Sequence, residues 1–132
     1  MIDHTGIIVA DFSKSRTFYE NALAPIGYSM LLELSKAVTG STDVAGFGEA
    51  PKPDFWIAGA TLDRPVNVPP VHVAFRVANR TMVDAFYHAA MAAGALDNGA
   101  PGLRPHYHPH YYGAFVLDPD GHNIEAVCHE PA

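Results

Sequence analysis

The sequence predicts an α+β fold built from two tandem copies of one βαβββ module. The chain repeats itself at a spacing of 68 residues, so that His4-Thr-Gly-Ile-Ile-Val-Ala10 returns as His72-Val-Ala-Phe-Arg-Val-Ala78. Along the same register, Phe18-Tyr19 returns as Phe86-Tyr87. Each copy also shows one strand, one helix and then three short strand-like runs. Two such modules can build one site between them.

The first strand of each module is expected at residues 3–10 and 72–77, because apolar and other residues alternate there. One face of each strand is apolar and can pack on a helix. His4 and His72 stand at the start of their strands on the opposite face. We therefore expect the two imidazoles to open onto equivalent surfaces.

A helix is expected after each of these strands. The first has an apolar stripe that contains Phe18 and Leu23, and Pro25 should end it. In the second, Thr81 and Asp84 resemble a capping box and Gly94 is a suitable C-terminal stop. Its apolar stripe follows helical spacing through Val83, Phe86, Tyr87, Ala90 and Met91.

The remaining strands are expected at 27–34, 43–48 and 55–60 in the first copy, and at 99–103, 112–118 and 122–128 in the second. Asp118-Pro-Asp-Gly121 suits a type I turn that joins the last two strands in a hairpin. The proline-containing residues 63–71 form the connection between modules. We expect one domain over 1–132, with module one at 1–62 and module two at 70–130.

Composition narrows the function classes. The chain has 132 residues, of which 48% are hydrophobic and 17% charged, so it should fold around a core. A net charge of -6 argues against a nucleic-acid partner, because phosphate binding relies on Lys and Arg. No apolar run is long enough to span a membrane, and no signal peptide is evident. With its single cysteine, Cys128, the chain is expected to be cytoplasmic.

Glu125 is the residue in the closing strand that points to chemistry. It should share the inner face with His4 and His72, while Ile124 and Ala126 face the helix. A buried carboxylate requires a partner charge or a metal. Two imidazoles and one carboxylate form a facial ligand set that leaves positions open for water or substrate. Moving Glu125 back by 68 residues reaches Ile57, so the first copy has a histidine but no acid.

These residues resemble the vicinal oxygen chelate superfamily of glyoxalases, bleomycin-resistance proteins, fosfomycin-resistance transferases and extradiol dioxygenases. The resemblance covers nearly the whole chain. It depends on the two strands that begin near His4 and His72, and above all on Tyr112-Gly-Ala-Phe-Val-Leu-Asp-Pro-Asp-Gly-His-Asn-Ile-Glu125. It implies a cup-shaped half-barrel of mixed sheet with helices outside, a homodimer, and metal ligands at His4, His72 and Glu125. Glyoxalases of the family usually have a fourth ligand, a glutamate, where we align Ile57.

The segment Arg104-Pro-His-Tyr-His-Pro-His-Tyr-Tyr112 precedes the last hairpin and can reach the mouth of the cup. Its prolines favour an extended chain that places His106, His108 and His110 on one side. The segment is interpreted as a substrate-contacting rim, a solvated loop or a separate metal site. The candidate catalytic acid or base is one of three side chains: His106, His108 and Tyr112. Candidate substrate contacts are Arg76, Arg104, His110 and Tyr111.

The sequence therefore predicts a divalent-metal-dependent enzyme, a glyoxalase-like lyase or isomerase, that acts on a small oxygen-rich molecule. The ligand set accepts Zn, Ni, Mn, Fe or Co. Alternatives are an antibiotic- or metabolite-binding protein, a fosfomycin-type transferase and a non-haem iron dioxygenase. The sequence leaves open whether the site forms within one chain or across two.

Overall fold

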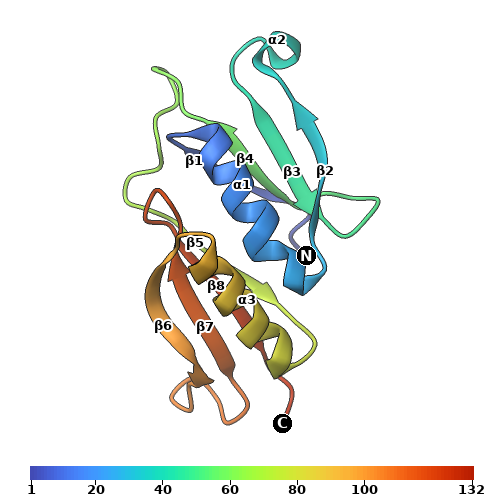
Figure 1. The fold of residues 1–132 in the computed structure, drawn as a ribbon, viewed down its shortest axis with the longest axis vertical. Coiled ribbons are helices and arrows are strands. Elements are labelled where there is room, and N and C mark those ends of the chain that lie inside the picture. The colour runs from blue at the N-terminus through green and yellow to red at the C-terminus, as the bar shows by residue number, and fades with distance from the viewer.

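The computed structural model describes residues 1–132 and contains two four-stranded mixed sheets, each covered on one side by a long helix (Figure 1). The first module consists of β1 (Thr5–Val9), α1 (Phe12–Leu23), the short 3-10 turn η1 (Ala24–Ile26), β2 (Ser29–Leu34), α2 (Lys36–Thr39), β3 (Val44–Gly48) and β4 (Phe55–Gly59). The second consists of β5 (His72–Arg76), α3 (Arg80–Ala92), β6 (Leu96–Leu103), β7 (Tyr112–Leu117) and β8 (Asn123–Cys128).

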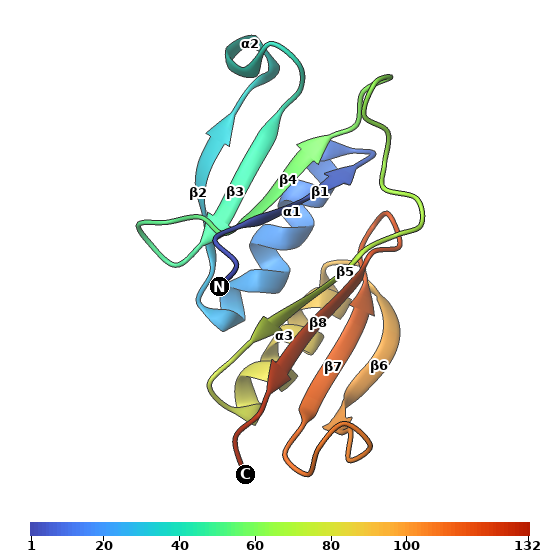
Figure 2. The same ribbon diagram turned by 180° about the vertical axis from the view of Figure 1, so that it is seen from behind.

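Strand order is the same in both sheets, β1-β4-β3-β2 and β5-β8-β7-β6. In each, the first strand lies parallel to the last and the other pairs are antiparallel. This confirms the α+β fold of two tandem βαβββ modules. The sheets curve but do not close on one another, and their helix-free faces lie on the same side of the molecule (Figure 2).

None of the helices has the length and apolar character that a membrane-spanning helix requires.

Helix ends are set by local chemistry. The Asp11 side chain caps α1 by accepting the Lys14 N–H at 3.1 Å, and Pro25 follows its last turn. The predicted capping box of α3 is wrong, because Asn79 is the N-cap and accepts the Met82 N–H at 2.9 Å. Gly94 follows α3 with φ of 102°, a left-handed conformation that glycine adopts without strain.

The core lies between the helices and the sheets, where α1 packs on α3 (Figure 1). Phe55 of β4 and Phe75 of β5 meet edge to face with ring centroids 5.3 Å apart. This contact joins the two modules, and Tyr19 of α1 packs on Phe55 from the first module. A single apolar cluster therefore holds both sheets in place.

The register of the sheets corrects one step of the repeat alignment. Gly6 pairs with Trp56 in the first sheet, whereas Ala74 pairs with Glu125 in the second. The last strands are thus related by 69 residues and not by 68. Ile57 is fully buried on the helix side. The residue that occupies the place equivalent to Glu125 is Trp56.

Candidate active site

His72 and Glu125 come together on the helix-free face of the second sheet. β5 and β8 are parallel neighbours, and the register puts His72 beside Asn123, two residues before Glu125. The His72 Nε2 atom lies 3.2 Å from Glu125 Oε1. The carboxylate is only 2% exposed, while the imidazole is 48% exposed. A buried acid beside an accessible imidazole is the part of the predicted ligand set that one chain assembles.

The hydrogen bonds of His72 determine which ring nitrogen is available. Nδ1 lies 2.9 Å from the Asn123 carbonyl oxygen, which can only accept, so Nδ1 carries the proton. In the neutral ring the Nε2 lone pair therefore points to Glu125. Metal-binding histidines have this arrangement, with one ring N–H held by a carbonyl or carboxylate and the other nitrogen free.

Tyr111 completes the surroundings of Glu125. Its hydroxyl donates a hydrogen bond to Glu125 Oε2. Burial, the hydrogen bond to Glu125 and the negative charge of that carboxylate raise the pKa of Tyr111 well above its ordinary value. Tyr111 is therefore a neutral donor at physiological pH. Its neighbour Tyr112 lies on the helix side, where it donates to Asp84 at 2.7 Å beneath Arg80.

His4 lies on the helix-free face of the first sheet, and its ring nitrogens do not form a close trio with the ligand atoms of His72 and Glu125. Its Nδ1 donates to Asp3 Oδ1 at 2.7 Å, which again leaves Nε2 free. This bond, followed by the contact with Lys52, lowers the pKa of Asp3. His4 opens onto a cavity of about 430 Å³ whose wall includes Trp56 and Arg64.

The loop between β6 and β7 is not the extended segment that the prolines suggested. Tyr107 N–H donates to the Arg104 carbonyl at 2.9 Å, and Tyr111 N–H donates to the His108 carbonyl at 3.2 Å. Pro105 and Pro109 are the second residues of these two consecutive turns, a position that proline favours. His106, His108 and His110 therefore do not line one side of a strand.

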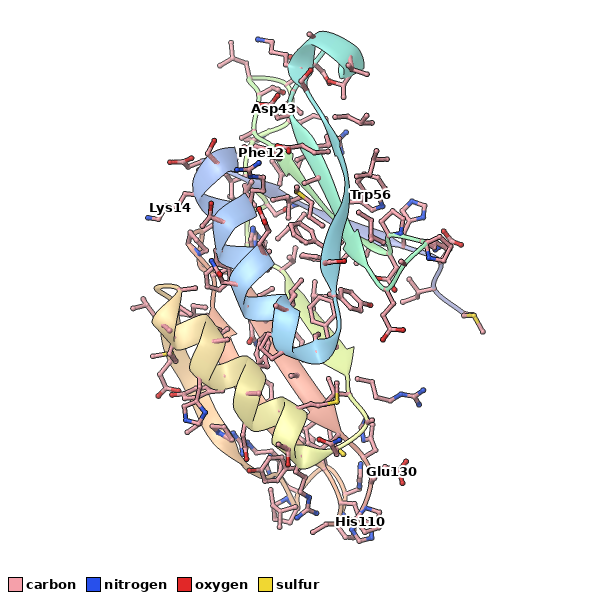
Figure 3. The ribbon with its side chains drawn as sticks, turned by 45° about the vertical axis from the view of Figure 1, so that its right-hand side comes forward. Phe12, Lys14, Asp43, Trp56, His110 and Glu130 are labelled. Carbon is pink, nitrogen blue, oxygen red and sulfur yellow. The ribbon has the colours of Figure 1, made fainter.

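The loop between β6 and β7, with His110, lies at the far end of the second sheet, near Glu130 and the C-terminus (Figure 3). His108 Nδ1 accepts the His110 N–H at 3.1 Å, and its Nε2 donates to His129 Nδ1 at 2.8 Å. His108 and His129 both pack edge-on against Tyr111, so this histidine pair adjoins the Glu125 site. His106 instead packs on Tyr107.

The two predicted substrate arginines have different surroundings. The guanidinium of Arg104 donates to the carbonyls of Ala100 and Gly102, both at 2.9 Å, and lies over the ring of Phe115. Because Phe115 stacks on His72, Arg104 is near the candidate site but is held by the backbone. Arg76 ends β5 and lines two hollows between the modules, both of which also include Glu49 of the first module.

Sequence reasoning missed a polar cluster in the final hairpin. The ligand atoms of Asp118, Asp120 and His122 lie within 4.8 Å of one another, the spacing of a cation site, and no other trio of such residues in the chain does so. His122 Nδ1 accepts the Val71 N–H at 3.0 Å, and Nε2 donates to the Ile8 carbonyl at 3.2 Å. Both nitrogens are therefore occupied by backbone groups.

The rest of this cluster also ties the modules together. Asp118 accepts the hydroxyl of Tyr19 from α1 at 2.5 Å, and Asp120 accepts the Ala10 N–H at 3.0 Å. Burial, followed by the charge of Asp118 and the hydrogen bond to it, raises the pKa of Tyr19 well above its ordinary value. These contacts make the cluster a structural link between the final hairpin and the β1–α1 segment.

Comparison with known proteins is consistent with this geometry. The sequence profile of the Glyoxalase/Bleomycin resistance protein/Dioxygenase superfamily matches residues 1–126. The chain belongs to this superfamily. Within the superfamily, a glyoxalase/bleomycin resistance protein from Albidiferax ferrireducens T118 is similar in structure, with a TM-score of 0.75, 24% identity and 98% of each chain covered.

Two further solved structures are similar to the chain. A glyoxalase I mutant from Zea mays matches with a TM-score of 0.70 and 21% identity, covering 96% of this chain and 46% of that one. TnmS3, an antibiotic-binding protein from Streptomyces sp. CB03234, matches with a TM-score of 0.66 and 16% identity, covering 98% and 96%. No curated protein matches the sequence significantly. At these identities the likeness concerns the fold alone.

Proposed function

We propose that this protein is a divalent-metal-dependent enzyme, a glyoxalase-like lyase or isomerase, that acts on a small oxygen-rich molecule. The observation that carries the proposal is the matched state of the two imidazoles. His4 and His72 each donate Nδ1–H to an oxygen, so that Nε2 is the nitrogen left for a metal, and Nε2 of His72 faces the buried carboxylate of Glu125. This donor set fits Zn, Ni, Mn, Fe or Co.

The position of His4 supports a site that is shared between two copies of the chain. Each chain presents His4 on one sheet and the His72–Glu125 pair on the other. A homodimer can bring the first sheet of one protomer against the second sheet of its partner. Each of the two contacts then combines His4 of one protomer with His72 and Glu125 of the other. The dimer then has two equivalent sites, as closed two-fold symmetry requires.

The residues of the chain divide the chemistry between them. A bound divalent ion would act as a Lewis acid toward neighbouring substrate oxygens. Glu125 supplies negative charge in a buried position, and Tyr111 fixes the orientation of that carboxylate by its hydrogen bond. Because Tyr111 retains its proton, it keeps this hydrogen bond to Glu125 at physiological pH.

A second candidate function is binding of an antibiotic or metabolite without turnover. Trp56 stands at the place equivalent to Glu125, so the first sheet offers an indole and no carboxylate. An indole cannot serve as a general base, but it can stack on a flat ligand.

Metal analysis distinguishes the two. We expect protein purified with added divalent metal to retain about one ion per chain, and His72→Ala and Glu125→Gln to lose it. His88 lies exposed on α3, so His88→Ala is the matched control and retains the ion. Absence of bound metal in the unmodified protein, or metal that persists in both site variants, would contradict the enzyme proposal and favour the binding protein.

A further inference from the structure

Trp56 lies on the side of the first sheet that faces away from α1 (Figure 3). Its indole covers the neighbouring strand at Gly46. A Cβ atom at Gly46 would come within 2.8 Å of the six-membered ring of Trp56 and 2.9 Å of Pro53. Only glycine leaves room for the ring here, because real Cβ contacts are not that close. The six-membered ring therefore lies against the strand at Gly46, and the Trp56 side chain also lines the cavity.

Arg64 supplies positive charge to the same cavity. It ends a tight turn after β4, in which Thr61 N–H donates to the Arg64 carbonyl at 2.9 Å and Arg64 N–H donates to Thr61 Oγ1 at 3.1 Å. The following linker is fixed by Asn67, whose side-chain oxygen accepts the Ile8 N–H at 2.9 Å. The backbone that carries Arg64 is thus held beside β1.

The guanidinium of Arg64 has no acidic partner. None of the salt bridges in the protein includes it, although the chain has an excess of acidic residues and a net charge of -6. An unpaired arginine in the wall of a cavity within an acidic protein is complementary to an anionic group. Arginine binds carboxylates through two parallel hydrogen bonds.

We propose that this cavity binds a planar aromatic ring that bears a carboxylate, with the ring stacked on Trp56 and the carboxylate bound by Arg64. The volume of about 430 Å³ is within the range of small-ligand sites and accommodates a fused two-ring system. The remaining wall is largely apolar, formed by Ile8, Val44 and Ala58. The proposal names the substrate class of the site proposed above and so depends on that function, and His4 would lie at the same cavity.

The test uses metal-free protein and three probes. Naphthoate has both the ring and the charge, naphthamide has the ring alone, and cyclohexanecarboxylate has the charge without a flat ring. Binding is measured by calorimetry. The indole N–H resonance is followed in parallel, and it is a single signal because Trp56 is the one tryptophan in the chain. We expect naphthoate to bind about tenfold more tightly than either other probe and to shift the indole signal.

Two variants assign the contacts. Arg64→Gln should bring the affinity for naphthoate down about tenfold, to that for naphthamide. Lys14→Gln is the control for charge alone, because Lys14 is exposed on α1, remote from the cavity, and should leave binding unchanged (Figure 3). Trp56→Leu should remove the preference for naphthoate over cyclohexanecarboxylate. Circular dichroism verifies that this variant folds, and Arg64, on the surface, provides the test if it does not.

Any of three results would overturn the proposal. They are equal affinity for naphthoate and naphthamide, equal weakening of binding by the Arg64 and Lys14 variants, and no binding of naphthoate at millimolar concentration. The outcome is independent of metal uptake. Protein that binds naphthoate but takes up no ion supports this inference and contradicts the proposed enzyme. Protein that takes up the ion at His72 and Glu125 but does not bind naphthoate does the reverse.

Discussion

Deleting one oxygen atom by Tyr19→Phe should destabilise the protein by about 2 kcal/mol. The Tyr19 hydroxyl donates to Asp118 at 2.5 Å, and the two residues are 0% and 4% exposed. When the hydroxyl is removed, the buried Asp118 carboxylate loses a hydrogen-bond donor that water cannot replace. Most of the cost of desolvating that oxygen is then no longer offset, and the folded state is destabilised. The ring itself remains, with its edge-to-face contacts on Phe18 and Phe55 at 5.0 and 5.1 Å.

Urea unfolding, followed by circular dichroism at one protein concentration, measures this change. With a urea slope of about 2 kcal/mol per M, the midpoint should fall by about 1 M. Tyr87→Phe is the matched control, because Tyr87 also donates to a carboxylate, that of Asp97 at 3.0 Å, but in an exposed position. It should cost less than about 0.5 kcal/mol. If the two variants are equally stable, the buried link between hairpin and α1 does not stabilise the fold as we reason.

Two other predictions concern packing and pH. Gly46→Ala should destabilise the protein by about 1–3 kcal/mol and change the fluorescence of Trp56. Gly6→Ala is the control and should cost much less, because its Cβ would lie 3.5 Å from its nearest neighbour. Similar losses of urea stability in the two variants would contradict the packing of the indole. Five of the tyrosines have raised pKa values in the folded state, so they keep their protons to higher pH than in the unfolded chain. Their contribution to the free energy of unfolding is therefore complete below the unfolded pKa of about 10 and decreases as pH rises above it. The affected residues are Tyr19, Tyr28, Tyr87, Tyr111 and Tyr112. Ultraviolet titration near pH 10 should show less tyrosinate in folded than in urea-unfolded protein, and identical curves would refute this.

The fold was predictable from the sequence because its signals are local and repeated. Alternation along the strands and helical spacing around Phe18 and Phe86 each report on a few neighbouring residues. The repeat added the pairing of modules. What it could not supply was the exact register, because the last strands are related by 69 residues while the first strands are related by 68. A slip of one residue moves a strand side chain to the other face, which is why Ile57 was aligned in place of Trp56.

The site was only partly predictable for a related reason. His72 and Glu125 were predicted to share a face, and they do, since both lie on neighbouring strands with regular alternation. Tyr112 was the predicted acid or base and Tyr111 a predicted substrate contact, but Tyr111 is the tyrosine that contacts Glu125, whereas Tyr112 bonds to Asp84 on the helix side. The cross-module bonds of His122 had no sequence signal, since Ile8 and Val71 contribute only backbone atoms to them.

The central claim is that two chains share each metal site, and mixed dimers test it most directly. His4→Ala and His72→Ala each remove one predicted ligand. When the two variants are unfolded together and refolded, dimers that contain one of each should have one site with both ligands missing and one intact site. We predict about one metal ion per mixed dimer and almost none in either variant alone. Mixed dimers that bind no metal, while the unmodified protein binds two ions, would show that each site forms within a single chain.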